Sequence, residues 1–172
     1  SAIGSYGGSL KDTPPIDLAI PVAKDAIAKS GVPADAIQHA IYGHVIHTEP
    51  RDMYSPRCIS IGAGLAETAP AFQVNRLCGS GLQAIVSATQ LIQLGDCDTA
   101  LAGGVEVMSR GAYILPAQRW GARMGDALGL FAALERRAIG RQQQLCAIGF
   151  QLRADIFKPN IFANRQPNAH AA

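Results

Sequence analysis

The sequence has few aromatic side chains, no large excess of charge of one sign, no long apolar run and no closely paired cysteines. Aromatic residues make up 6% of the 172 residues, whereas glycine alone occurs 18 times. Small residues let helices and sheets approach closely, which favours a layered α/β protein over a β-sandwich. Hydrophobic residues make up 48% and charged residues 16%. The chain can therefore bury the core of one domain and does not belong to the disordered class.

The charge balance and the lack of apolar runs argue against two kinds of partner. The formal net charge is +2 at pH 7, and lysine and arginine form no long run, so electrostatics gives no reason to expect nucleic acid. No stretch approaches the roughly 18 apolar residues of a membrane span. The N-terminus has no basic region followed by an apolar one, so no signal peptide is expected.

The cysteine pattern predicts neither a metal site nor a disulfide framework. The chain contains Cys58, Cys78, Cys97 and Cys146, with no CxxC spacing and no metal-type pairing with histidine. Disulfide-stabilised domains are small and dense in cysteine, unlike this long apolar chain. We therefore expect reduced thiols in a cytoplasmic protein, with packing roles for all of them except Cys78.

Hydrophobic periodicity predicts alternating helices and strands before residue 108. Pro14 and Pro15 precede an amphipathic segment and Gly31 follows it, which is typical of a helix start and stop. Pro21 inside this segment either kinks the helix or delays its start. Ser55 and Pro56 form a second helix start. The expected elements are helices over 16–30, 55–65 and 80–94, strands over 37–46, 71–76 and 99–107, and a polar loop over 48–54.

The centre of the chain predicts a βαβ unit with a buried helix. Small or apolar residues cover most of the circumference of the helix over 80–94, which is typical of a helix buried on several sides. A strand precedes it and an alanine-rich strand follows, so the two strands are expected to be parallel. After residue 108 we expect a long packed loop over 110–126, helices over 127–134 and 142–154, and a loose tail over 159–172.

The residues around Cys78 suit nucleophilic chemistry. Cys78 lies between a predicted strand and a predicted helix, where unpaired N–H groups and the helix dipole favour the nucleophilic thiolate. Gly79 and Gly81 allow a sharp turn and leave room for an acyl group, and Ser80 can cap the helix. The backbone N–H of Cys78 can bind a developing oxyanion.

A purely structural interpretation stays open beside the catalytic one. Cysteine is commonly a small buried side chain, and a Gly-Ser-Gly turn before a helix also occurs as a plain turn. The local residues alone favour neither interpretation. For the histidines we expect structural roles; these are His39, His44, His47 and His170.

Four segments of the sequence resemble the thiolase family. VNRLCGSGLQAIVSATQLIQLGD resembles the family's nucleophile segment, and Cys78 falls on its nucleophilic cysteine. The other three are AIGSYGGSLKDTPP, GHVIHTEPRDMYSPR and AGGVEVMSRGAYILPAQRWGARMGD. The resemblance covers residues 2–126 and is nearest to bacterial acetyl-CoA acetyltransferases and 3-ketothiolases.

The resemblance implies a layered thiolase-like α/β fold that is incomplete. We expect its N-terminal βαβ-type half, with a mixed, mainly parallel sheet and a buried central helix. Residues 1–126 would form the nucleophile domain, whose first strand would precede Ser1, and residues 127–172 a divergent helical segment and loose tail. Thiolases are usually dimers or tetramers, so a homo-oligomer is expected. The loop with Arg119, Trp120 and Arg123 would serve that interface or pack locally.

The implied activity is acyl transfer between coenzyme A thioesters through an acyl thioester on Cys78, in the condensing or the thiolytic direction. No covalently bound cofactor and no metal is expected, and the CoA-binding residues are not identified. The family's catalytic histidine and second cysteine lie in a C-terminal half, in Gly-His-Pro and Cys-x-Gly-Gly-Gly motifs that this sequence lacks. We therefore predict that the chain alone is inactive. The alternatives are a condensing enzyme like a ketoacyl synthase and a non-catalytic fragment acting in assembly.

Overall fold

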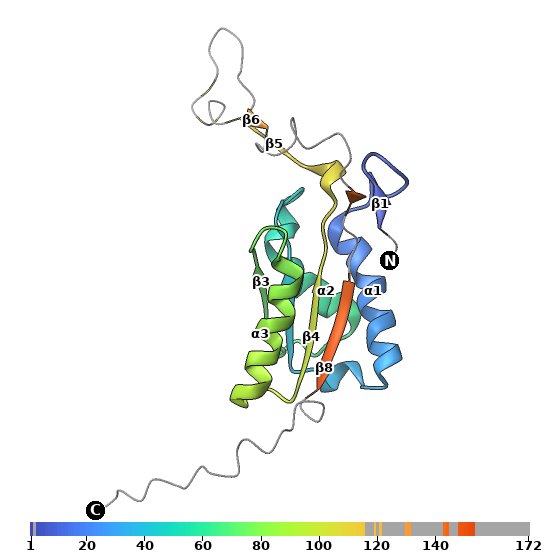
Figure 1. The fold of residues 1–172 in the computed structure, drawn as a ribbon, viewed down its shortest axis with the longest axis vertical. Coiled ribbons are helices and arrows are strands. Elements are labelled where there is room, and N and C mark those ends of the chain that lie inside the picture. Colours follow the sequence, from blue (N-terminus) through green and yellow to red (C-terminus); the bar gives the residue numbers. More distant parts are fainter. Residues whose placement is uncertain are drawn as a thin grey trace, which may run out of the picture.

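A sheet with helices on both faces forms the body of the molecule (Figure 1). The computed structural model describes residues 1, 3–115, 119, 121, 130–131, 143–144 and 148–153. In this part of the chain the helices are α1 (Pro15–Ser30), α2 (Ser55–Ala63) and α3 (Ser80–Leu94), with 3₁₀ turns η1 (Ala34–Ala36), η2 (Pro50–Tyr54) and η3 (Met108–Arg110). The strands are β1 (Gly4–Ser5), β2 (His39–Gly43), β3 (Ala71–Val74), β4 (Thr99–Gly104), β5 (Tyr113–Ile114), β6 (Leu130–Phe131), β7 (Gln143–Gln144) and β8 (Ile148–Arg153).

The main sheet is mixed and mainly parallel, as predicted. Its strand order is β3-β2-β4-β8. β2 pairs in parallel with β3 and with β4, whereas β8 runs antiparallel to β4. The chain passes from β3 through α3 to β4 and crosses over β2 on the way. The predicted βαβ unit is therefore present, with a third strand between its two strands.

Strand alternation builds a core on each face of the sheet. Ala40 and Tyr42 of β2 pack in a cluster with residues of α1 and α2, whereas Ile41 between them packs with α3. Successive side chains of a strand point to opposite faces, so α1 and α2 lie on one face and α3 on the other. The core beside α3 is built largely from small side chains, which let the helix lie close to the sheet; they include Ala84, Ala88, Ala100 and Ala102.

The first helix starts where the prolines predict and runs through the third proline. Pro15 lies at its first position, Gly31 ends it with φ 70°, and Pro21 lies inside it. A proline removes one N–H of the helix ladder, but it does not delay the start here.

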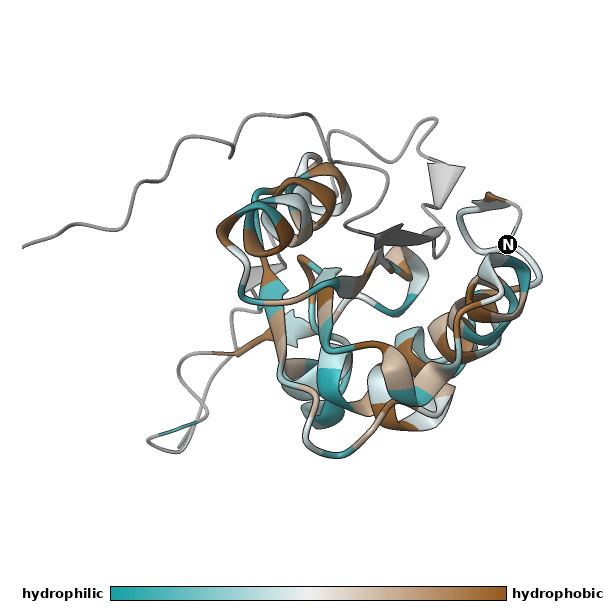
Figure 2. Ribbon diagram, turned by 90° about the horizontal axis from the view of Figure 1, so that it is seen from below, coloured by the Kyte–Doolittle hydropathy of each residue, from teal (hydrophilic) through white to brown (hydrophobic). Residues whose placement is uncertain are grey.

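The central helix is less buried than predicted. α3 buries Ser80, Ala84, Ala88 and Ile92 against the sheet, but Leu82 and Leu94 are 68% and 76% exposed, and Val86 is also exposed. Figure 2 shows hydrophobic residues around this helix, including the side turned away from the sheet. The pattern correctly indicated an apolar circumference, but only one face is covered by the described residues.

Two predicted helices near the C-terminus are wrong where the structure describes them. β6 falls within 127–134, and β7 and β8 fall within 142–154. Residues 148–153 alternate Ile-Gly-Phe-Gln-Leu-Arg, which is the period of a strand, and β4 offers them an unpaired edge. The predicted tail over 159–172 lies outside the described residues, and the domain boundary at residue 126 stays a prediction.

The segment after β4 also differs from the predicted packed loop. Tyr113 and Ile114 form β5, which pairs with β6, and both side chains are exposed.

No helix in the described ranges has the length and apolar character needed to cross a membrane.

Candidate active site

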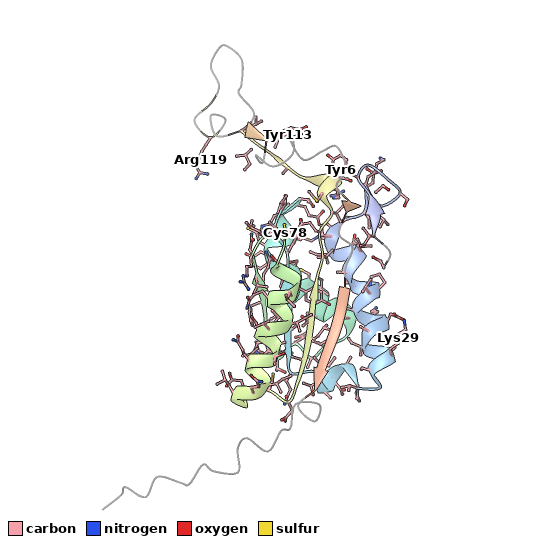
Figure 3. The ribbon with its side chains drawn as sticks, in the orientation of Figure 1. Tyr6, Lys29, Cys78, Tyr113 and Arg119 are labelled. Atoms are coloured by element: carbon pink, nitrogen blue, oxygen red, sulfur yellow. The ribbon has the colours of Figure 1, made fainter. Side chains whose placement is uncertain are left out.

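Cys78 lies at one edge of the sheet, where the three parallel strands end. β3 ends at Val74, α3 begins at Ser80, and the turn between them carries Cys78. β2 and β4 end at the same edge because all three strands are parallel. The thiol is exposed, and Figure 3 shows it beside the start of α3. This edge is the usual place for functional residues in open α/β sheets.

The turn before Cys78 is bent at a residue other than the glycines. Leu77 has φ 50°, and it is the one non-glycine residue with positive φ in the described part of the chain. Gly79, in contrast, has φ −89°. A left-handed conformation costs an L-residue about 1–2 kcal/mol, so strain is stored directly beside the candidate nucleophile. The prediction that Gly79 makes the sharp turn is therefore wrong.

Ser80 stabilises the turn instead of capping the helix. Gly79 is the N-cap residue, with no side-chain cap hydrogen bond. The Ser80 hydroxyl donates to the Leu77 carbonyl at 2.7 Å and accepts from the Arg76 N–H at 2.8 Å. The predicted cap is wrong because Ser80 is already inside the helix, and its hydroxyl closes the preceding turn.

The backbone of the same turn uses two of its N–H groups. The Gly79 N–H donates to the Arg76 carbonyl at 3.1 Å, and the Ser80 N–H donates to the Leu77 carbonyl at 3.0 Å. Neither group is therefore directed at a ligand. The predicted oxyanion donor, the N–H of Cys78, stays a prediction.

Two glycines, Gly43 in β2 and Gly104 in β4, let the ends of these strands touch the start of α3. A Cβ on Gly43 would lie 2.5 Å from the carbonyl carbon of Ser80, and one on Gly104 would lie 3.3 Å from the Cα of Gly81. Cβ atoms almost never come as near to backbone as 2.5 Å, so only glycine fits at residue 43. This close contact fixes the start of α3, and with it Cys78, against the edge of the sheet.

A largely buried carboxyl group lies at the same edge. The Glu106 carboxyl group, two residues after β4, accepts the Val45 N–H at 2.9 Å and the Ile46 N–H at 3.1 Å. Burial raises the pKa of Glu106 to about 7, and the Asp52 charge adds to the rise while the two backbone hydrogen bonds oppose it. β2 ends at Gly43 and not at residue 46 because these two N–H groups bind a carboxylate instead of a neighbouring strand.

His44 is buried beside Glu106. Its Nε2 lies 3.7 Å from Glu106 Oε1, which is too long for a hydrogen bond, and its Nδ1 lies 3.3 Å from the Ser55 hydroxyl. Burial lowers the pKa of His44, with the nearby Asp52 charge opposing. Burial therefore favours the neutral form of the histidine. Ser55, predicted as a helix cap, bonds to His44 instead. The hydroxyl of Ser55 also donates to Gln73 Oε1 at 2.7 Å.

A second carboxylate orders the loop after His44. The buried Asp52 accepts hydrogen bonds through Oδ2 from the Thr48 N–H, the Thr48 hydroxyl and the Glu49 N–H. Arg110 joins this loop to other parts of the chain, contacting Glu49 at 3.2 Å and the Asp12 carbonyl at 3.1 Å. The predicted polar loop over 48–54 is thus largely the ordered 3₁₀ turn η2.

The other sequence candidates do not form a second site. Cys97 is buried and burial raises the pKa of its thiol, whereas Cys58 is half-buried on α2. His39 packs edge-on against Phe72, and His47 contacts the Gln73 amide. Among the described residues, no three histidine, cysteine or acidic side chains gather closely enough to hold a metal. Arg119 is exposed, and Cys146, Trp120, Arg123 and His170 lie outside the described residues.

Sequence analysis missed Leu77 and Glu106, whereas His44, for which it predicted a structural role, is fully buried. One signal was available: Glu106 is an isolated acidic residue between Val105 and Val107 at the end of a buried strand. A charge in that position requires a buried partner. The positive φ of Leu77 had no sequence signal, because leucine is not a residue that favours that conformation.

The comparisons with known proteins all point to the same family. The model of the thiolase N-terminal domain matches residues 1–140. The chain is similar to the β-ketothiolase BktB of Cupriavidus necator, with 57% identity over 127 residues that cover 74% of this chain and 32% of that protein. It is also similar to the acetyl-CoA acetyltransferase of Escherichia coli, with 39% identity over 127 residues, covering 73% and 32%.

Solved structures give the same result. The acetyl-CoA acetyltransferase of Bacillus anthracis matches with a TM-score of 0.71 and 38% identity, covering 75% of this chain and 32% of that chain. Human mitochondrial 3-ketoacyl-CoA thiolase in complex with CoA matches with a TM-score of 0.70 and 34% identity, covering 73% and 32%. The chain thus spans about a third of the length of these relatives, not the half that the sequence suggested.

Proposed function

Because the chain belongs to the thiolase family, we propose that it supplies the nucleophile of an acyltransferase acting on coenzyme A thioesters, with Cys78 as the residue that carries the acyl group. The observation that supports this most directly is the exposed thiol at the start of α3, beside a strained turn at the edge of a parallel sheet. Strained backbone conformations cluster at functional sites.

The proposed chemistry has two steps. The Cys78 thiolate attacks the thioester carbonyl of an acyl-CoA, and the tetrahedral intermediate collapses with loss of the CoA thiolate. The enolate of a second acetyl-CoA then attacks the acyl group on Cys78, which releases the Cys78 thiolate and forms 3-ketoacyl-CoA. Thiolysis runs the same steps in reverse. This chemistry needs a reduced thiol, which supports a cytoplasmic location as a further proposal.

The exposed side of α3 supports the proposal that further sequence completes the site. Leu82, Val86 and Leu94 are exposed apolar side chains of α3, and apolar side chains gathered on one element are normally covered. The matched residues cover only 32% of the relatives. We propose that the remaining part of such a protein covers this side of α3 and supplies the acid–base residues. We also propose a homo-oligomer, and predict that the chain alone is inactive.

Two alternative functions make different predictions. A ketoacyl synthase would use acyl carrier protein, but the family match favours thiolase and therefore CoA as the acyl carrier. A non-catalytic fragment would show no acyl transfer even when the rest of a thiolase is supplied.

A chimera tests the proposal. The first 126 residues would replace the matching segment of the Cupriavidus necator β-ketothiolase, which aligns with 57% identity. We expect thiolysis of acetoacetyl-CoA by the chimera, its loss in the Cys78→Ala variant, and its retention in the Cys58→Ala variant. Activity that survives Cys78→Ala, or that needs acyl carrier protein, would contradict the proposal. An inactive chimera that is folded would favour the non-catalytic fragment.

A further inference from the structure

We propose that Glu106 is a positioning residue for Cys78, acting through residues 44–46 and the Asn75 side chain on the left-handed turn at Leu77. The inference rests on the proposed function, since it assumes that Cys78 is the nucleophile. It concerns a side chain 28 residues after Cys78 in sequence, connected to the preceding Leu77 through hydrogen bonds and the Val45 backbone.

The first step of the path joins Glu106 to the end of β2. Its carboxylate accepts two successive backbone N–H groups, those of Val45 and Ile46, at 2.9 Å and 3.1 Å. A carboxylate that bridges neighbouring N–H groups fixes the backbone between them, because charge-assisted hydrogen bonds are short and strong. The Glu106 side chain is only 12% exposed, so water competes little for these bonds.

The second step joins this backbone to the residues before Cys78. The Asn75 side-chain amide donates to the Val45 carbonyl at 3.4 Å, and the Gln73 amide donates to the His44 carbonyl at 3.3 Å. Both acceptors belong to the segment that Glu106 holds. The position of Asn75 therefore depends on the position of Val45.

The third step joins Asn75 to the strained turn. Its Oδ1 accepts the Leu77 N–H at 3.1 Å, and Leu77 is the residue with φ 50° directly before Cys78. One side chain thus bridges the held backbone and the residue directly before Cys78. Leu77 is 63% exposed, so core packing does not keep it in this conformation.

The reactivity of Cys78 toward iodoacetamide tests this path without any CoA substrate. We expect Glu106→Gln to slow alkylation of Cys78 about two- to five-fold, because the thiolate would be held less firmly at the helix N-terminus. The sign is informative. If Glu106 acted on Cys78 only through its charge, removing that charge would favour the thiolate and speed the reaction.

Asn75→Ser gives a second test at the surface. Serine keeps a short side-chain acceptor for the Leu77 N–H but does not reach the Val45 carbonyl. We expect the same slowing as in Glu106→Gln, and no further slowing in the double variant, since two residues on one path are not additive. Glu67→Gln is the matched control, because Glu67 is exposed in the loop between α2 and β3.

Cys58 and Cys97 report on the fold in the same reaction. Their alkylation, followed by peptide mapping, should stay unchanged in each variant. Slower alkylation of Cys78 alone, in both single variants and without additivity, supports the proposal. An unchanged or faster rate in either variant, or slowing factors that multiply in the double variant, overturns it. If Glu106→Gln does not fold, the result for Asn75→Ser decides. Failure of acyl transfer in the chimera would instead reject the proposed function and leave these rates unaffected.

Discussion

At the scale of single residues, the turn at Leu77 makes a prediction about stability. Asparagine tolerates positive φ, whereas a β-branched residue is strongly disfavoured there. Leu77 is largely exposed, so its substitution changes little packing. We expect Leu77→Asn to stabilise the chain by about 0.5–1 kcal/mol and Leu77→Val to destabilise it by about 1 kcal/mol. Urea denaturation at low protein concentration measures both, and equal stabilities would mean that the turn is not left-handed.

Glu106 makes a prediction about pH. Its carboxyl group has a pKa raised to about 7, mainly by burial, so the folded state holds the proton more tightly than the unfolded chain. This contribution to stability is fully present below about pH 4.5 and is lost as the pH rises through about 7. The free energy of unfolding of the native protein, relative to that of Glu106→Gln, should therefore fall by roughly 3 kcal/mol between about pH 4.5 and about pH 8.

Neighbouring groups do not change the sign of that prediction. The charged and titratable groups that face Glu106 are His44, at the end of β2, and Asp52, in η2. The pKa of His44 is lowered by burial, so its own contribution to stability rises with pH below about 6.5. Because His44 and Asp52 are present in both proteins, their direct contributions cancel in the comparison. Parallel stability curves for the two proteins would contradict the prediction.

The sequence predicted Cys78 as the nucleophile but gave no sign of Glu106 and Asn75, the residues that we propose to position it. Its neighbours Gly79 and Gly81, together with the predicted strand and helix on either side, were enough to place it at a helix start. Glu106 bonds to Ile46 across 60 residues of sequence, and Asn75 bonds to Val45 across 30 residues. No local sequence pattern predicts contacts between residues so far apart. Contacts of this kind follow from the order of the strands, which the sequence did not specify.

At the scale of secondary-structure elements, the contact between α3 and the sheet depends on Gly43. An alanine there would place a Cβ 2.5 Å from the Ser80 backbone, so α3 would have to move away from β2. We expect Gly43→Ala to destabilise the chain by about 1–3 kcal/mol and to slow alkylation of Cys78. Denaturation with urea and the alkylation rate measure the two effects.

Gly81 offers the matched control. It lies in the first turn of α3, and a Cβ there would meet nothing within 4 Å. Alanine is the better helix former, so Gly81→Ala should be neutral or stabilise by about 0.5–1 kcal/mol. If both variants behave alike, the close contact between α3 and β2 does not determine the position of the turn.

Helices and strands were predicted well where the apolar residues followed one period, and poorly where a helical and a strand period overlapped. α1 and α3 have long, regular apolar patterns, and both lie within two residues of their predicted bounds. Residues 148–153 carry alternation over only six positions, which a helical interpretation of a longer window obscured. The deciding interaction is pairing with β4, and an edge available for pairing is a property of the assembled sheet.

At the scale of the whole molecule, the exposed outer side of α3 makes a prediction about association. If this surface contacts other polypeptide, replacing Leu82 and Val86 by glutamine should reduce self-association of the chain and binding of a hydrophobic dye. The same change should lower the thiolysis activity of the chimera. The exposed Ile61 on α2 gives the control substitution, Ile61→Gln. Analytical ultracentrifugation and dye fluorescence measure the effects, and equal results for the two helices would show that the α3 surface has no special role.

The most direct test of the central claim is to trap the acyl group on Cys78. The chimera would be mixed with acetyl-CoA, quenched in acid and digested, and its peptides analysed by mass spectrometry. The account predicts one acetyl group on the peptide that contains Cys78, lost on adding CoA and absent from the Cys78→Ala variant. Acetylation of another cysteine, or a folded chimera that acetylates none, would contradict it.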